Sequence, residues 1–262
     1  MSLLTVEGLS IEFGGLKAVN NVAFSVKPGE ILSVIGPNGA GKTTLFNMIS
    51  GLYMPSAGKV VLERKDITGL KPHQLAALGL SRTFQNLQIF LQMSALENVM
   101  VGCHLSEGRN ILADLLGLPS SIKRSNASRG EAYRLLERVG LQDQADKEAS
   151  GLSYGALKRL EIARALAVQP SLLLLDEPAA GCNAVETEEI DRLIARIATE
   201  GVAVLLVEHD MKLVMKISNH VIVLDQGAKI TEGPPAEVAR NPKVIEAYLG
   251  VKATSGGDHA PG

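Results

Sequence analysis

The sequence predicts an α/β fold in which a mostly parallel sheet carries a phosphate-binding loop, and three observations support it. A strand-like segment at 30–35 runs into the glycine-rich loop GPNGAGKTT, which opens a helix. Two continuous apolar segments, at 172–175 and 202–207, are typical of parallel strands buried on both faces. Residues 87–151 have helical spacing and no convincing strand, which indicates a helical insert.

The remaining elements follow from hydrophobic period and turn residues. Strands are expected at 3–9, 9–13, 17–26, 30–35 and 58–63, with a short strand before Gln85 and a hairpin at 220–233 that turns at 225–227. Helices are expected at 44–52, 71–79, 95–105, 127–141, 184–201, 235–240 and 241–250. The core is therefore expected to comprise residues 1–86 and 152–250, with the insert at 87–151 and a disordered polar tail at 251–262.

Composition excludes several classes of function. The 262 residues carry a formal net charge of −2, which gives no basic surface for nucleic acid, and no nucleic-acid partner is expected. The longest apolar segment, 202–207, is far shorter than the roughly 20 residues that a membrane-spanning helix needs. The N-terminus has no signal-peptide pattern, and the two cysteines have neither the number nor the spacing of a disulfide framework or zinc site.

The loop at 36–43 fits the P-loop pattern G-x-x-x-x-G-K-[ST]. Its glycines let backbone N–H groups turn inward around phosphate oxygens, and the helix that follows adds partial positive charge. Lys42 can reach the β- and γ-phosphates, and the Thr43 hydroxyl can ligate Mg²⁺. The residues expected to hold the nucleotide here are Gly36, Pro37, Asn38, Gly39, Ala40, Gly41, Lys42, Thr43 and Thr44.

Polar residues follow the buried strands. Asp176 and Glu177 come at the end of one, where ligands bind in parallel sheets, so we expect Asp176 in the Mg²⁺ shell and Glu177 as general base for an attacking water. His209 at the end of the next strand could hydrogen-bond the γ-phosphate or that water. Gln85, before the helical insert, could ligate Mg²⁺ or orient water, or act as a hinge.

These pieces together resemble one family. The P-loop, Gln85, LSYGALKR at 152–159, LLLLDEP at 172–178, AAGCN at 179–183 and His209 stand in the order typical of the ATP-binding subunits of ABC transporters. The resemblance covers residues 4–250 as a single ABC transporter domain. It implies the ABC ATPase fold: a P-loop NTPase with a RecA-like core, an N-terminal antiparallel β subdomain and an inserted α-helical subdomain.

The resemblance also implies roles in binding ATP. Phe13 would stack on adenine, with Val19 nearby, although an aromatic strand residue packed on the core is the alternative for Phe13. LSYGALKR resembles the signature motif, whose serine and glycine, here Ser153 and Gly155, cap the γ-phosphate held by the P-loop of a second subunit. The chain departs from the usual pattern at Tyr154 and Ala156 in this motif and at Asn183 in the D-loop, which puts the rate of hydrolysis in doubt.

Flanking segments narrow the resemblance. GLSRTFQN, ENVMVG, EHDMKLVM and NPKVIEAYLG are similar to the larger ATPase subunit of branched-chain amino-acid importers of the Liv type. This implies an ATP hydrolase that powers import, a paralogous second ATP-binding subunit, two transmembrane permease subunits and, indirectly, an extracytoplasmic solute-binding protein. It implies a peripheral location on the cytoplasmic face of the inner membrane.

Other interpretations remain open from the sequence. The chain could serve another ABC system, for a different solute or for lipopolysaccharide export, or it could be a non-transport cytosolic ABC ATPase. A GTPase is disfavoured because no Asn-Lys-x-Asp sequence occurs.

Overall fold

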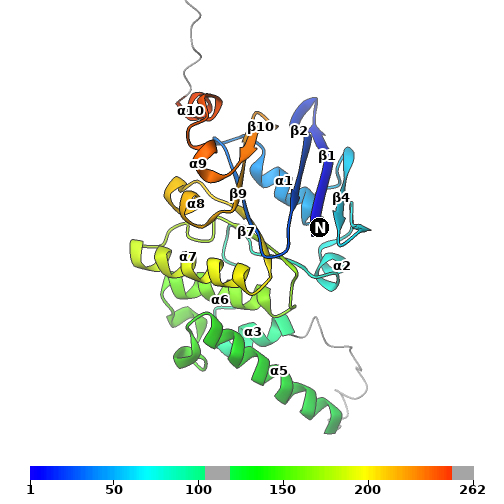
Figure 1. Ribbon diagram of the computed structural model, residues 1–262. Coiled ribbons are helices and arrows are strands. Elements are labelled where there is room, and N and C mark those ends of the chain that lie inside the picture. Colours follow the sequence, from blue (N-terminus) through cyan, green and yellow to red (C-terminus); the bar gives the residue numbers. More distant parts are fainter. Residues whose placement is uncertain (104–118, 250–262) are drawn as a thin grey trace, which may run out of the picture.

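The computed structural model describes residues 1–103 and 119–249, and these form two sheets with helices packed around them (Figure 1). The N-terminal sheet is antiparallel, in the order β2-β1-β4-β5. Its strands are β1 (Leu4–Phe13), β2 (Leu16–Val26), β4 (Ala57–Leu62) and β5 (Lys65–Asp66). The predicted tail at 251–262 lies outside the described residues.

The two strands expected at 3–9 and 9–13 are one strand, which corrects the sequence-based prediction. β1 continues through Gly8, whose φ of 59° fits an irregularity in the strand, and its register against β2 shifts between Val6 and Leu9. A bulge of this kind bends a strand without ending it.

The second sheet carries the strands that end at the candidate site. Its order is β10-β9-β3-β8-β7-β6, and all neighbours are parallel except β9 and β10. The strands are β3 (Ile31–Ile35), β6 (Leu80–Arg82), β7 (Leu172–Asp176), β8 (Ala203–Val207), β9 (His220–Asp225) and β10 (Ala228–Gly233). Every residue of β3, β7 and β8 is buried, which confirms the prediction of parallel strands covered on both faces.

Helices connect and cover these strands. They are α1 (Lys42–Ile49), α2 (Pro72–Ala77), α3 (Ala95–Cys103), α5 (Pro119–Arg138), α6 (Tyr154–Leu166), α7 (Ala184–Thr199), α8 (Met211–Ile217), α9 (Pro235–Val238) and α10 (Pro242–Leu249), with 3₁₀ turns at Gln142–Gln144 and Ala149–Gly151. Helix α8 was not expected, and it begins where the Asp210 carboxylate caps the backbone N–H groups of Lys212 and Leu213. Among the described residues, none of the helices has the length and apolarity needed to cross a bilayer.

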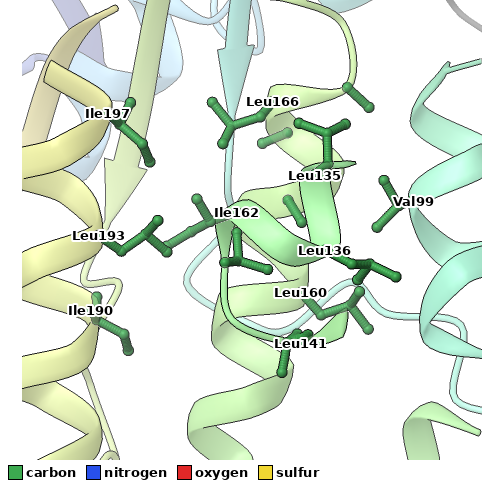
Figure 2. Packing of buried hydrophobic residues seen from close by; sticks show 14 of the residues in the cluster. Val99, Leu135, Leu136, Leu141, Leu160, Ile162, Leu166, Ile190, Leu193 and Ile197 are labelled. Carbon is green, nitrogen blue, oxygen red and sulfur yellow. The ribbon is translucent and has the colours of Figure 1, made fainter. Parts of the chain in front are cut away.

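Helix α6 joins the helical segment to the core (Figure 2). Side chains of α6 lie between those of α7 on one side and those of α3 and α5 on the other, with Leu160 and Ile162 among them. Helical spacing at 127–141 places four apolar residues on one face, and all four are buried: Ala132, Leu135 and Leu136 of α5, and Val139 just after it. One apolar cluster thus runs from the helices onto a face of the parallel sheet, including Leu173 and Leu175 of β7.

Candidate active site

The phosphate-binding loop links β3 to α1 and depends on its glycines. Gly39 and Gly41 have φ of 79° and 98°, which favour glycine. A Cβ at Gly41 would lie 2.5 Å from the Ala18 carbonyl oxygen, and one at Gly36 would collide with the carbonyl oxygen of Leu224. The loop can therefore take this path only without side chains at these positions.

Groups on both sides of Gly36 hold the start of the loop. The Lys42 ammonium donates to the carbonyl oxygens of Gly36 and Pro37 at 2.7 and 2.9 Å. On the other side, the backbone N–H of Gly36 donates to the Tyr248 hydroxyl of α10 at 2.9 Å. Burial lowers the pKa of Lys42, while the charges of Glu177 and Asp176 oppose that change. Tyr248 was not anticipated, because it lies 212 residues from Gly36 in the sequence.

A cavity of about 710 Å³ opens over this loop. It is lined by residues 38–44 of the loop and α1, by Gln85 after β6 and by Glu177 after β7. The structure therefore brings together the P-loop, Gln85 and Glu177, which the sequence predicted to share a site. Gln226 and Gly227 of the β9–β10 turn also line the cavity and were not expected there.

Glu177 and His209 lie at neighbouring strand ends, as the parallel pairing of β7 with β8 requires. His209 Nδ1 is 3.7 Å from Glu177 Oε1 and 3.8 Å from Glu208 Oε2. Glu177 has a φ of 49°, and its backbone N–H donates to the Val207 carbonyl oxygen at 2.9 Å. The backbone at Glu177 is therefore held in position by the end of β8. Binding and polarisation of a water molecule by this pair, Glu177 and His209, stays a prediction.

Glu208 lies beside this pair, although the sequence analysis did not single it out. The Glu208 side chain is buried, and burial raises the pKa of its carboxyl group. Its carboxylate accepts from the backbone N–H groups of Ala179 and His209 at 3.5 and 3.2 Å. It therefore ties the loop after β7 to the end of β8.

Asp176 is buried and paired. Its Oδ2 accepts from Arg82 Nη2 at 3.0 Å, and the same guanidinium donates through Nη1 to Asn47 Oδ1 and Ser50 Oγ, both at 2.7 Å. Burial raises the pKa of Asp176, and the Arg82 charge opposes that rise. The sequence analysis missed Arg82. The role of Asp176 as a magnesium ligand stays a prediction.

Phe13 and Val19 lie near the loop in different ways. The Phe13 ring packs edge-on against Tyr53, with ring centroids 5.5 Å apart, and Phe13 is half-exposed. Val19 is fully buried, and a Cβ at Gly41 would touch its Cγ2 at 3.3 Å. Neither residue is among those that line the cavity, although the nearby Leu16 is. Their contacts with adenine therefore stay predictions.

The segment that resembles the signature motif, residues 152–159, stands apart from the cavity. Ser153 caps α6 by accepting from the Ala156 N–H at 3.2 Å, and Gly155 presents its N–H in the first turn. Neither Ser153 nor Gly155 lines the P-loop cavity in the part of the chain that the structure describes. Instead, both donate to Glu186 Oε1 of α7, each at 3.1 Å.

A P-loop at the carboxyl edge of a parallel sheet, with a glutamate and a histidine at the next strand ends, defines a P-loop nucleoside triphosphatase. Residues 19–180 match the model of the ABC transporter family, and residues 228–254 match that of branched-chain amino acid ATP-binding cassette transporters. The chain belongs to the ABC transporter family, as one of its ATP-binding cassettes.

Similar proteins span the whole cassette. The chain is 46% identical to the high-affinity branched-chain amino acid transport ATP-binding protein LivG of Escherichia coli K12, over 95% of this chain and 98% of that protein. It is also 46% identical to BraF of Pseudomonas aeruginosa, a protein described in the same terms, with the same coverage. The ADP conformation of an ATP-binding cassette from an ABC transporter has a TM-score of 0.83 and 34% identity, covering 96% of this chain and all of that one.

Proposed function

We propose that this chain is the ATP-hydrolysing subunit of an importer for branched-chain amino acids. Support comes from the P-loop cavity with Glu177 at its edge and from relatives whose names specify branched-chain amino acid transport. The observation that carries the mechanism is the position of Ser153 and Gly155 outside that cavity. A motif that lies outside the cavity of its own chain can instead contact a nucleotide held by another chain.

The P-loop cavity supplies the groups for hydrolysis of a γ-phosphate. Backbone N–H groups and Lys42 bind the phosphates, Glu177 accepts the proton of the attacking water, and His209 orients it. Thr43 and Gln85 line the same cavity and offer a hydroxyl and an amide oxygen, and with Asp176 they suit Mg²⁺, which prefers oxygen ligands. When bound, Mg²⁺ neutralises charge on the phosphates.

Two cassettes complete each other's sites. A second ATP-binding subunit, homologous to this chain and in most such importers a paralogue, places its P-loop nucleotide against Ser153 and Gly155 of this chain. Its own equivalent motif covers the nucleotide held here. The γ-phosphate thus bridges two subunits, and its removal releases them.

A second cavity, of about 510 Å³, suits the permease. It lies between the end of α1, α2, residues 84–90, α3 and α6, and it is largely apolar. Phe84, Phe90 and Leu87 line it together with Glu161 and Arg164, and the Arg164 guanidinium lies 5.6 Å from the centre of the Phe90 ring. An amphipathic helix with a polar residue facing Glu161 or Arg164 fits such a groove.

In this arrangement, two transmembrane permease subunits each insert a cytoplasmic helix into one cassette. The chain is then peripheral, on the cytoplasmic face of the inner membrane, and an extracytoplasmic solute-binding protein delivers the amino acid to the permeases. Solute selectivity lies outside this chain.

Reconstitution tests this function. The chain is purified from membranes with the proteins that bind it, and the complex is placed in liposomes with internal MgATP and with the solute-binding protein outside. Uptake of leucine, isoleucine and valine is expected with the wild-type chain and absent with Lys42→Ala. Copurification of no integral membrane protein, or ATP-dependent uptake restricted to another class of solute, would contradict the proposal.

A further inference from the structure

The donors of the signature motif are already occupied within this chain. Glu186 Oε1 accepts from both the Ser153 hydroxyl and the Gly155 N–H, each at 3.1 Å. The other carboxylate oxygen, Oε2, accepts from the Asn183 N–H at 3.2 Å, which completes the capping box of α7. One side chain thus connects the start of α6 with the D-loop.

The Glu186 side chain packs so closely against residue 155 that only glycine fits there. A Cβ at Gly155 would lie 2.6 Å from both Cγ and Cδ of Glu186. The carboxylate therefore occupies the space that a side chain at 155 would fill. This contact is also directional, because the single N–H of Gly155 can donate one strong hydrogen bond at a time.

The charge of Glu186 is well suited to this position. Hydrogen bonds from Asn183, Gly155 and Ser153 lower the pKa of its carboxyl group, so it is an anion at neutral pH. It is therefore held by the same kind of donors, at a helix N-terminus, that hold a phosphate oxygen. A γ-phosphate that approaches these donors meets a negative charge in its place.

We propose that Glu186 is an internal stand-in for the γ-phosphate, a positioning residue that holds Ser153 and Gly155 until the nucleotide of the partner cassette displaces it. The inference rests on the proposed function, in which those two residues seal the partner's ATP. Displacement requires a γ-phosphate, so ADP does not free the motif. Because the contact to Asn183 uses the other oxygen, Glu186 can release the motif and keep its cap on α7.

The test measures how much ATP is needed to close the two cassettes. The chain carries Glu177→Gln and its partner ATPase subunit carries the same change at the equivalent glutamate, so that hydrolysis stops at both sites; closed complexes are counted by mass photometry as MgATP is increased. Adding Glu186→Gln removes the charge and keeps the shape of the cap. The concentration of ATP at half-closure is expected to fall about three- to tenfold, since bonds to the neutral amide are weaker than those to the carboxylate.

Matched variants show whether the change in half-closure comes from the charge of Glu186 itself. Glu188→Gln removes the same charge from an exposed position of α7 whose carboxylate pairs with Arg192, and it is expected to leave half-closure unchanged. The affinity of the chain's own P-loop for ATP should be equal in all variants. Glu186→Asp, which retains the charge on a shorter side chain, replaces the Gln variant if that protein does not fold, and is also expected to lower the half-closure concentration.

The outcomes distinguish failure of the stand-in role of Glu186 from failure of the proposed function. If the Glu177→Gln parent closes with ATP but Glu186→Gln closes at the same or a higher ATP concentration, the stand-in role is wrong and the proposed function stands. If the parent does not associate with its partner at saturating ATP, the proposed function itself is wrong and this inference falls with it.

Discussion

Arg82 Nη2 lies 3.0 Å from Asp176 Oδ2, and this ion pair joins the last residues of β6 and β7 at the carboxyl edge of the parallel sheet. Both side chains are buried, with relative exposures of 8% and 2%. The guanidinium also binds Asn47 and Ser50, at and just after the end of α1. The acid that sequence analysis assigns to the metal shell is therefore held by a cation tied to the helix that follows the P-loop.

Replacing Arg82 should destabilise the fold strongly. Arg82→Met leaves the Asp176 carboxylate buried without its partner, and removing one member of a buried pair costs about 3–5 kcal/mol. Urea unfolding measures the loss. Arg192→Met, which breaks an exposed pair with Glu188, is the control and should cost under about 1 kcal/mol. Equal stability of the two variants would contradict this account of the pair.

Glu177→Gln should retain ATP binding and nearly abolish turnover. The amide keeps the shape of the side chain but cannot accept a proton from water, and loss of a general base lowers rates by about 10²–10⁴. Phosphate release and equilibrium binding of labelled ATP measure the two effects separately. Turnover at the wild-type rate would remove Glu177 as the base.

Lys42→Ala should weaken ATP binding. The substitution removes the ammonium that donates to the Gly36 and Pro37 carbonyl groups and can reach the phosphates. Isothermal titration with MgATP measures the affinity, and Lys65→Ala on the exposed strand β5 serves as the control. Normal affinity in Lys42→Ala would show that the cavity over the P-loop is not the nucleotide site.

Glu208 predicts a pH dependence of stability. Burial raises the pKa of its carboxyl group above the ordinary value of 4.5, so the folded state favours the protonated acid. Its contribution to stability is full below pH 4.5 and is lost as pH rises through the raised pKa. The unfolding free energy of Glu208→Gln, minus that of the wild type, should therefore increase with pH across this window. A difference that stays constant or decreases would contradict the assignment.

Much of this site could be predicted from local sequence patterns. The P-loop spacing and the acids after a buried strand predicted a shared cavity, because parallel strands bring their carboxyl ends to one edge. Gln85 and Glu177 line that cavity, and His209 lies beside Glu177. Burial of the apolar face formed by Ala132, Leu135, Leu136 and Val139 likewise follows from helical periodicity.

Other features depend on three-dimensional packing. Arg82 reaches Asp176 because β6 pairs with β7 in one register, with Arg82 opposite Leu174, and no local pattern fixes that register. Glu186 meets Gly155 across 31 residues because of how α7 packs against α6. Helix α8 is only seven residues long, too short for its periodicity to be distinguished from a loop.

The most direct test of the account asks whether Ser153 acts on its own chain's nucleotide or on another's. The measurement is ATP-dependent closure of the chain with its partner cassette after Ser153→Arg, with Glu177→Gln in this chain and the equivalent change in the partner. We expect the chain's own P-loop to bind ATP with unchanged affinity, while half-closure requires about a hundredfold more ATP or is lost. Closure at the parent's ATP concentration would contradict sealing in trans.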